Sequence, residues 1–452
     1  MLGEELAGSS RVVALVASTL ADARVEDAPQ ILHSYYTRQR DGALRLNFEI
    51  EDRSSLRIEA IPSTTGTLLA ASDALAHHLD ARAHAFSTSN TLAMEAWGRG
   101  DFERAVEIDP DFGSAWLSRV RMLAQSGNSE EALRAADSAL ARKTLRTDWS
   151  RGELRVLAAS IRKDFSARAA ALSDLANLAP ADPITLASAA EAQGLARNFS
   201  ASADLYRKLG VLEPSDPAAL NPLGYAEGLA GNLEAARKAF EKYGKLPGSK
   251  ANSHDSMGEV YFMNGRFREA EQEFFQAIAL DPNFLGGSAM VKAAYAHWLA
   301  GDLPGADAML QKFTASLAKS NLSLAVWRQA TWLYATGRSD RALAMLSKAP
   351  PDERIRRQLS AWQNIGRLSS SAPSSLDTLR AIYSSTPPAL DGLPRVLYAS
   401  ALLEAGKESE ARAILKRWPL PENSREPEFD SIVFPKYLEL RKTLRLAIEP
   451  AN

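Results

Sequence analysis

The chain has 452 residues, which is enough for several domains or for one elongated array of repeats. Its 53 basic and 55 acidic residues nearly balance, and this argues against a nucleic-acid partner, which would need a concentrated basic surface. The absence of cysteine excludes disulfides, thiolate catalysis and cysteine-based zinc sites, and it leaves the redox compartment open.

Neither a membrane span nor an export signal is recognisable. The most apolar early run, residues 12–16, is far shorter than the ~20 residues that a transmembrane helix requires. The opening MLGEELAGSS lacks a basic segment followed by an apolar one, so no signal peptide is expected. The compartment stays undetermined: the cytoplasm is favoured, with the periplasm as the alternative if the chain is part of a longer protein.

Residues 1–85 predict a small α+β domain. A helix is expected from Ser9 to Ala23, followed by extended runs at residues 30–37, 43–50 and 55–61. Asp41-Gly42 and residues 52–54 are turn signals, so the three runs should form an antiparallel meander. In the third run Ile61 falls out of phase with Leu56 and Ile58. A helix over residues 65–79 should cover one face of this sheet.

The stretch from Asn252 to Phe284 has the period of two short amphipathic helices. Met257, Gly258 and Tyr261 share one face of the first helix, and Ala270, Phe274 and Ala277 share one face of the second. Gly265 is suited to the positive φ that ends the first helix, and Asp281-Pro282 ends the second. This pattern resembles a tetratricopeptide (TPR) repeat, in which small residues let paired helices approach closely.

The same turn position recurs along the chain. Glycine occupies it at Gly127, Gly231, Gly265, Gly301, Gly337 and Gly406, and Lys163 and Arg197 occupy it in degenerate repeats. The separations are 34 or 36 residues, except for a final 69, which predicts one more degenerate unit around residues 352–386. Five residues after each of these six glycines the chain has an alanine: Ala132, Ala236, Ala270, Ala306, Ala342 and Ala411.

We therefore expect a mainly α protein: a right-handed α-solenoid of TPR-like helix pairs, preceded by the α+β domain with its three-stranded antiparallel sheet. The predicted domains are residues 1–85, a junction with a truncated repeat at 86–112, the solenoid at 113–425 and a capping helix within 426–452. Arg168 and Ser202 replace the expected alanine, so these two helix pairs are candidates to splay apart, and Pro222 lies inside a first helix. The N-terminal domain resembles the TolB-amino-terminal-like or FlgO-like domain that precedes TPR arrays in some bacterial regulators.

No constellation of residues predicts catalysis. The chain lacks Gly-x-Ser-x-Gly, Walker and His-Glu-x-x-His motifs. Asp73 and His77 lie one helical turn apart and would make half of a metal site, but a solvated helix face is the favoured interpretation. His254 and His297 fall on first helices, where a packing role is favoured. We expect no enzyme, no metal and no cofactor.

The candidate site is instead the concave groove that the TPR resemblance implies. Positions two, five, nine and twelve of successive first helices should face it: Asn221, Tyr225, Asn252, Asp255, Glu259, Phe262, Val291, Tyr295, Trp298, Trp327, Thr331 and Tyr334. Aromatic residues suit a binding surface, although packing against neighbouring helices is the alternative for Trp298 and Trp327. Asn221 and Asn252 would hydrogen-bond an extended peptide backbone.

The charges expected in the groove differ from the family's best-known binding mode, in which basic residues grip a C-terminal carboxylate. Only Lys292 and Arg328 lie near the expected groove edge, while Asp255 and Glu259 make part of the groove acidic. A ligand with apolar and some basic character is therefore favoured over a carboxylate tail.

Three functions remain open from the sequence. The favoured one is a non-enzymatic scaffold that binds a protein or peptide in the groove. The second is a regulatory or sensory portion of a bacterial signalling protein linked to a kinase or winged-helix domain, which only the resemblance implies. The third, much less favoured, is a metal-dependent enzyme at the domain junction, based on Asp73, His77 and His84. The oligomeric state is left open.

Overall fold

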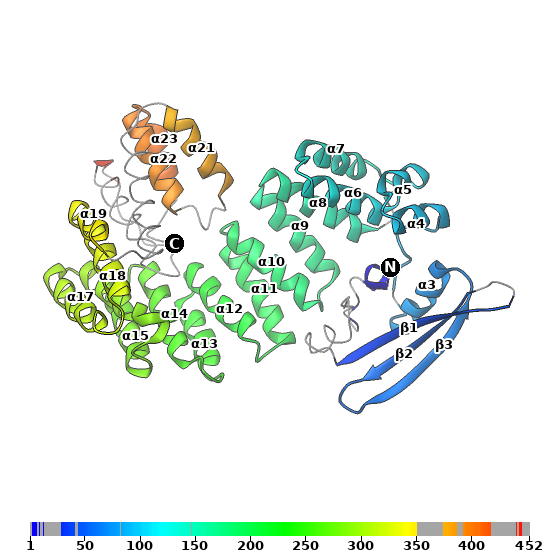
Figure 1. Ribbon diagram of the computed structural model, residues 1–452, viewed down its shortest axis with the longest axis horizontal. Coiled ribbons are helices and arrows are strands. Elements are labelled where there is room, and N and C mark those ends of the chain that lie inside the picture. Colours follow the sequence, from blue (N-terminus) through cyan, green and yellow to red (C-terminus); the bar gives the residue numbers. More distant parts are fainter. Residues whose placement is uncertain are drawn as a thin grey trace. The chain divides into compact units, whose positions relative to one another are not determined.

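The computed structural model describes residues 2–6, 9, 12, 29–40, 44–81, 83–145, 147–349, 374–386, 392–416, 440, 443 and 444 (Figure 1). The chain divides into two compact units, residues 1–192 and 193–452. Among the helices of these described ranges, none combines the length and apolar character that crossing a bilayer demands. The structure is mainly α, with a small antiparallel sheet near the N-terminus, as the sequence predicts.

The sheet lies at the start of the first unit. Strands β1 (Gln30–Arg38), β2 (Leu44–Asp52) and β3 (Arg57–Thr65) pair antiparallel in the order β1-β2-β3, which confirms the expected meander (Figure 1). Helix α3 (Leu68–Leu79) packs on one face, where Leu46, Phe48 and Ile61 meet Ala71 and Leu75. The expected helix over one sheet face is thus confirmed.

The phase change in the third strand follows from the alternation of side chains between the two faces. Ile58 pairs with Glu51 and Ile61 pairs with Phe48 in one continuous register, so the two isoleucines lie on opposite faces, and the register shift at Leu46/Phe48 comes only beyond Ile61. Ile61 is 7% exposed, whereas Ile58 is 60% exposed. The predicted start of this strand at residue 55 was wrong, because Leu56 adopts φ 55° in the turn and the strand begins at Arg57.

The beginning of the chain differs from the prediction. A short helix, α1 (Leu2–Glu5), precedes the segment expected to be helical. The expected helix from Ser9 to Ala23 lies outside the described residues, apart from Ser9 and Val12.

Helix pairs fill the rest of the described chain. The first unit contains α4 (Thr91–Gly98), α5 (Phe102–Ile108), α6 (Gly113–Gln125), α7 (Ser129–Leu140), α8 (Asp148–Arg162) and α9 (Phe165–Leu178), and α10 (Pro183–Leu195) crosses the boundary. The second contains α11 (Phe199–Leu212), α12 (Pro217–Leu229), α13 (Leu233–Tyr243), α14 (Lys250–Met263), α15 (Phe267–Leu280), η1 (Phe284–Gly287), α16 (Ser288–Leu299), α17 (Leu303–Leu317), α18 (Leu322–Ala335), α19 (Ser339–Ser347), α21 (Ser374–Ser385), α22 (Gly392–Glu404) and α23 (Glu408–Lys416). The short α5 matches the expected truncated repeat, and Pro222 lies inside α12 as predicted.

The turn glycines have the backbone conformation that the repeat pattern predicts. All six adopt positive φ, between 72° at Gly265 and 116° at Gly301. Lys163 and Arg197 adopt φ 55° and 65° at the equivalent position of the degenerate repeats. A residue with a Cβ atom pays a steric cost in this region, so the two degenerate turns keep the repeat geometry at the expense of some strain.

Small residues bring the helices of each pair together. The six repeated alanines are completely buried. An added Cβ at Gly258 would lie 2.6 Å from the ring of Phe274, and one at Gly224 would lie 2.4 Å from Phe240. In the degenerate repeats, Ala169 is buried in place of Arg168, and Ser202 is itself buried. Neither pair therefore loses its contact layer at this position, contrary to the suggested splaying.

The last described helices form their own apolar cluster. Leu379, Val396, Leu402 and Leu415 pack together with Leu440 and Leu444. Two residues of the preceding repeats, Phe267 and Leu299, pack against the same cluster. Most of the predicted unit at 352–386 and of the capping helix lies outside the described residues, so the domain boundaries remain predictions.

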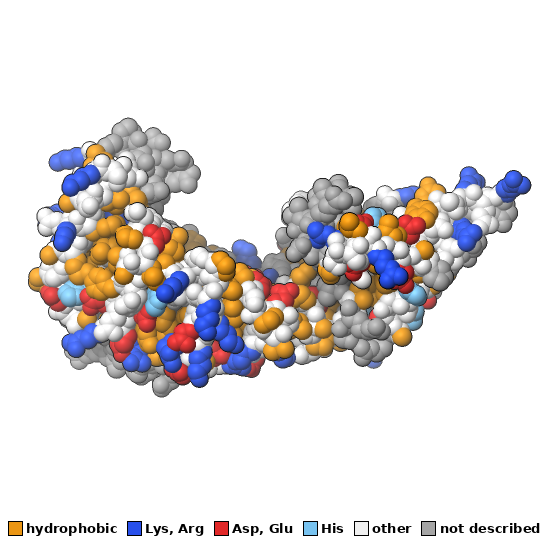
Figure 2. All heavy atoms as spheres, turned by 90° about the horizontal axis from the view of Figure 1, so that it is seen from below, with side chains coloured by type: hydrophobic (Ala, Val, Ile, Leu, Met, Phe, Trp, Pro, Cys, Tyr) orange, Lys and Arg blue, Asp and Glu red, His pale blue; other side chains and the backbone are white. Residues whose placement is uncertain are grey.

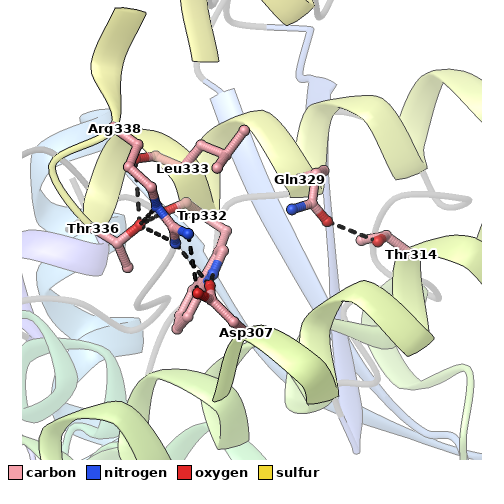
Figure 3. Close-up of polar contacts among 7 residues, drawn as sticks. All are labelled: Asp307, Thr314, Gln329, Trp332, Leu333, Thr336 and Arg338. Atoms are coloured by element: carbon pink, nitrogen blue, oxygen red, sulfur yellow. Dashed lines mark hydrogen bonds and ion pairs between the residues drawn. The ribbon is translucent and has the colours of Figure 1, made fainter. Parts of the chain in front are cut away.

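A polar cluster joins α17, α18 and α19 (Figure 3). Asp307 accepts hydrogen bonds from Trp332 Nε1 at 2.6 Å and from Arg338 Nη2 at 2.7 Å and Nη1 at 3.0 Å. Arg338 follows the turn glycine and also donates from Nε to Thr336 Oγ1 at 2.9 Å. The hydrogen bond from Arg338 lowers the pKa of Asp307, although partial burial opposes the shift.

Candidate binding site on the first helices

The first helices of successive pairs lie side by side in the second unit. In Figure 1, α12 and α14 run along the inner edge of this unit, and α13 and α15 run along its outer edge. Helix α12 packs directly against α14. We call the surface formed by α12, α14, α16 and α18 the first-helix face.

A buried polar network crosses three of these helices. Lys292 Nζ of α16 donates to Asp255 Oδ2 at 2.7 Å and to Glu259 Oε1 at 2.5 Å, both on α14. From α12, the hydroxyl group of Tyr225 donates to Glu259 Oε2 at 2.5 Å. The side chains of Lys292, Asp255 and Glu259 are only 1–3% exposed. The network therefore joins three successive repeats through hydrogen bonds that water hardly reaches.

The protonation of this network follows from its burial. Burial raises the pKa of Glu259 to about 8 despite the neighbouring ammonium group of Lys292. Burial would lower the pKa of Lys292, but Glu259 and Asp255 raise it above its usual value. Burial raises the pKa of Asp255 as well, although Lys292 opposes the shift. The single ammonium group of Lys292 thus serves both acidic side chains.

The structure corrects the expected exposure of several candidate residues. Asp255, Glu259, Phe262, Val291, Tyr295 and Thr331 are all buried rather than displayed on an open surface. The two acidic residues turn toward Lys292, the ring of Phe262 lies 5.4 Å from that of Phe267, and the ring of Tyr295 lies 5.1 Å from that of Trp332. These positions join helices together, which the repeat position by itself does not reveal.

The expected basic edge and acidic groove are also corrected. Lys292 is fully buried between the two acidic residues, so it is not a basic group at a groove edge. Because it neutralises them, the preference for a basic ligand loses its support. Arg328 is likewise buried, with its guanidinium carbon 4.9 Å from the ring centre of Trp327.

Five candidate residues remain partly exposed on the first-helix face: Asn221, Tyr225, Asn252, Trp298 and Trp327. Asn252 Nδ2 donates to the hydroxyl group of Tyr243 at 2.8 Å, so its amide is already engaged. Asn221 Oδ1 has no hydrogen-bond partner among the described residues. The side chain of Tyr334 lies outside the described set.

Aromatic packing supports part of this surface. Trp298, Tyr295 and Trp332 form a three-ring cluster with centroid separations of 5.1–6.2 Å. Trp298 therefore has the packing role that the sequence left open as an alternative, while it stays partly exposed. Trp332 was missed because its position in the first helix α18 faces α17, the second helix of the preceding pair, where Asp307 accepts its indole hydrogen bond.

Several histidines have hydrogen-bond partners on their own or neighbouring helices. His77 Nδ1 lies 2.9 Å from the carbonyl oxygen of Asp73 on the same helix. His254 pairs with Glu273 at 2.7 Å, and His297 lies between Glu271 and Asp302. Within the ranges that the structure describes, no group of three or more His, Asp or Glu residues is arranged to hold a metal ion.

The comparisons with known proteins concern the fold. No protein-family model and no curated protein sequence matches the chain. A solved tetratricopeptide repeat protein from Parabacteroides merdae is 15% identical, with 55% of this chain and 97% of that chain covered and a TM-score of 0.37. The C-terminal part of a TPR repeat-containing protein from Cytophaga hutchinsonii is 13% identical over 51% of this chain and 96% of its own, with a TM-score of 0.35.

Yeast Tom70 is 12% identical, with 79% of this chain and 88% of that chain covered and a TM-score of 0.33. At such identities no functional property passes from these proteins to this chain. The TPR-like fold of the helix pairs rests on their own geometry, namely the left-handed turn residues and the buried alanines described above.

Proposed function

We propose that the chain is a non-enzymatic interaction scaffold that receives a protein or peptide segment on the first-helix face. The observation that carries this proposal is the succession of partly exposed aromatic residues, Tyr225, Trp298 and Trp327, on three different first helices. Such side chains offer a large apolar area at little rotamer cost and keep a polar group for orientation.

The buried network supports the proposal because it makes the face rigid. Tyr225 is anchored through its hydroxyl group to Glu259, which in turn bonds Lys292 of the next first helix. A surface whose side chains are already fixed loses little conformational entropy when a ligand binds. The network itself is buried and contributes positioning rather than contact.

The chemistry of the face favours an apolar, aromatic-rich segment. The ionisable groups of α14 and α16 neutralise one another, so they offer no fixed charge to a carboxylate or to a basic side chain. We therefore expect apolar contacts to dominate, with weak dependence on salt.

The test compares two aromatic truncations in the full chain. Peptides are first selected on the wild-type chain from a random peptide library, and their affinities are then measured for Trp327→Ala and Phe275→Ala. Trp327 lies on the first-helix face, whereas Phe275 is an exposed aromatic of α15. We expect a loss of at least about tenfold for Trp327→Ala and none for Phe275→Ala, since a truncated aromatic anchor typically costs more than about 1 kcal/mol.

An equal loss for both variants, or full affinity in Trp327→Ala, would contradict the assignment to this face. Unchanged thermal melting of both variants is required for the comparison. The regulatory alternative stays a prediction, because it rests on the resemblance of the N-terminal domain and no contact in the structure favours it.

A further inference from the structure

The first described residues bind at the start of a helix far along the chain. Glu4 of α1 accepts a hydrogen bond at its Oε1 from the backbone amide of Ser87, at 2.9 Å. Its Oε2 accepts a short hydrogen bond from Ser114 Oγ, in the first turn of α6. The amide of Ser114 in turn donates to Ser87 Oγ at 3.3 Å. A single carboxylate therefore meets two donors that come from two other segments.

Helix α6 is capped by Ser87 of another segment rather than by its own N-cap residue. Its N-cap residue, Phe112, has an apolar side chain and makes no side-chain hydrogen bond to the first turn. The first amides of a helix lack intrahelical partners and carry a partial positive charge, which favours an anion. Ser87 is completely buried beside this helix start. Ser87 Oγ accepts the amide of Ser114, and Glu4 binds the hydroxyl group of Ser114 from 110 residues away, whereas Asp101 accepts a backbone amide of α5 directly.

The neighbouring residue, Glu5, binds the α+β domain. Its Oε2 accepts a short hydrogen bond from Ser72 Oγ of α3, and its carbonyl oxygen accepts the amide of His84 at 3.1 Å. Leu2 packs against the apolar cluster under the sheet, and Leu6 is buried. Adjacent residues of α1 therefore hold two different parts of the first unit, the α+β domain and the first turn of α6.

The buried side chain of Glu5 makes an unfavourable contribution to the contacts of α1. Its side chain is completely buried, and Oε1 has no hydrogen-bond partner among the described residues. An unsatisfied buried carboxyl oxygen is unfavourable, so other contacts of α1 must offset it. The charge-assisted bonds of Glu4 are the strongest polar contacts available for this, since hydrogen bonds to ionised groups exceed neutral ones.

We propose that Ser87, Ser114 and the first turn of α6 form a carboxylate-binding site, and that α1 is its internal acidic ligand. Occupation of this site by Glu4 fastens the α+β domain to the first helix pairs. The site offers a carboxylate two hydrogen-bond donors, the amide of Ser87 and the hydroxyl group of Ser114, at the positive end of a helix of 13 residues.

Chemical rescue in the full chain tests the proposal. In Glu4→Ala, hydrogen exchange at the Ser87 amide should accelerate by about tenfold, because a charge-assisted hydrogen bond is lost. Sodium acetate should restore part of the protection by placing a carboxylate in the vacated site. Acetamide, its neutral isostere, and sodium chloride at equal ionic strength should not.

The matched control is Glu130→Ala. Glu130 also lies in the first turn of a helix, but its side chain is 93% exposed and its nearest cationic partner, Arg134, is 3.7 Å away on the same helix. This variant should leave exchange at Ser87 unchanged. Wild-type exchange in Glu4→Ala, or equal effects of acetate and acetamide, would overturn the proposal.

A second variant covers the case in which Glu4→Ala does not fold. Ser114→Ala removes one donor from the site and leaves α1 intact. Exchange at the Ser87 amide should then rise by a smaller factor than in Glu4→Ala, and added acetate should have no effect because Glu4 still occupies the site. Unchanged protection at Ser87 in this variant would also count against a carboxylate site built from these groups.

Discussion

Lys292 and Glu259 are joined by a buried hydrogen bond between successive first helices: Nζ lies 2.5 Å from Oε1, and each side chain is 1% exposed. Because Asp255 adds a second carboxyl group at 2.7 Å, one ammonium group serves two acidic residues. The pair therefore fixes the spacing of α14 and α16 and sets the charge of the network at the centre of the first-helix face. Figure 2 shows charged side chains of both signs lying among broader apolar areas on the face that it views.

Removing the ammonium group should destabilise the second unit strongly. Lys292→Met leaves two carboxyl groups buried without a cation, which typically costs about 3–5 kcal/mol. The triple variant Lys292→Met, Asp255→Asn, Glu259→Gln should lose less, since no buried charge remains. Urea unfolding followed by circular dichroism measures both. A triple variant as unstable as the single one would show that packing rather than charge dominates here.

The raised pKa of Glu259 should make stability fall as pH rises. The folded state holds a proton on Glu259 up to about pH 8, whereas the unfolded chain releases it near pH 4.5. Between these values the folded state binds more protons, so the free energy of unfolding decreases with increasing pH. Glu259→Gln should have a flatter profile over this window. Parallel profiles for both proteins would mean that Glu259 ionises normally.

His297 should add a second loss of stability at higher pH. Its Nδ1 lies 2.8 Å from Glu271 Oε1 and its Nε2 lies 3.0 Å from Asp302 Oδ2, and two carboxylates require a donor on both nitrogens. Partial burial opposes the charge, but the hydrogen bonds to Asp302 and Glu271 raise the pKa of His297 above 6.5.

The stabilisation from this imidazolium group is fully present below pH 6.5, the unfolded value, and is lost as pH rises through the higher folded value. Melting temperatures measured from pH 5.5 to 8.5 should therefore decline less in His297→Gln than in the wild type. His78→Gln, on an exposed position of α3, should keep the wild-type profile. A decline of equal steepness in His297→Gln would contradict the role of this group.

Two glycine-to-alanine substitutions should have opposite effects. Gly258→Ala places a methyl group 2.6 Å from the ring of Phe274 and should cost about 1–3 kcal/mol through overpacking. Gly210→Ala, within α11, meets no atom within 4 Å and should gain about 0.5–1 kcal/mol from helix propensity. Thermal melting of both variants checks the difference. A stabilised Gly258→Ala would mean that the α14–α15 pair has room to separate.

The degenerate turns should accept glycine with a gain in stability. Lys163 adopts φ 55° at the end of α8, a conformation that costs a residue with a Cβ atom about 1 kcal/mol. Lys163→Gly should therefore raise the urea midpoint of unfolding. The gain is reduced because glycine increases the conformational entropy of the unfolded chain. Gly127→Lys, at φ 82°, should lower it. Equal and small effects in both variants would argue that these turns relax freely.

The candidate site shows where pattern reasoning reaches its limit. Counting residues from Gly265 correctly assigns Asp255 and Glu259 to the first helix of the pair. The count does not show which side chains of an adjacent helix lie against them. Lys292 lies on the adjacent first helix and turns toward both acidic residues, so the three side chains become buried instead of exposed. The sequence contains this signal only as opposite charges in successive repeats, which also occur on solvated faces.

The contacts of α1 mark a second limit of reasoning from sequence patterns. The opening residues show no periodicity, and a helix of four residues has no recognisable pattern. Glu4 reaches this helix start only because folding brings it to the hydroxyl group of Ser114, and sequence rules for capping consider residues within one turn of the helix start. The missing local cap at Phe112 is the only trace that the sequence alone offers.

The sequence by itself determined the helix pairs, their turns and the antiparallel meander. These features depend on local backbone preferences and on repeated small residues, such as the positive φ at Gly265 and the contact layer at Ala270, which recur at fixed spacing. The tertiary structure alone decided which polar groups meet, as with Glu4 at Ser114 or Lys292 at Glu259. Such encounters join residues of separate elements, and their energies depend on burial, which no local pattern records.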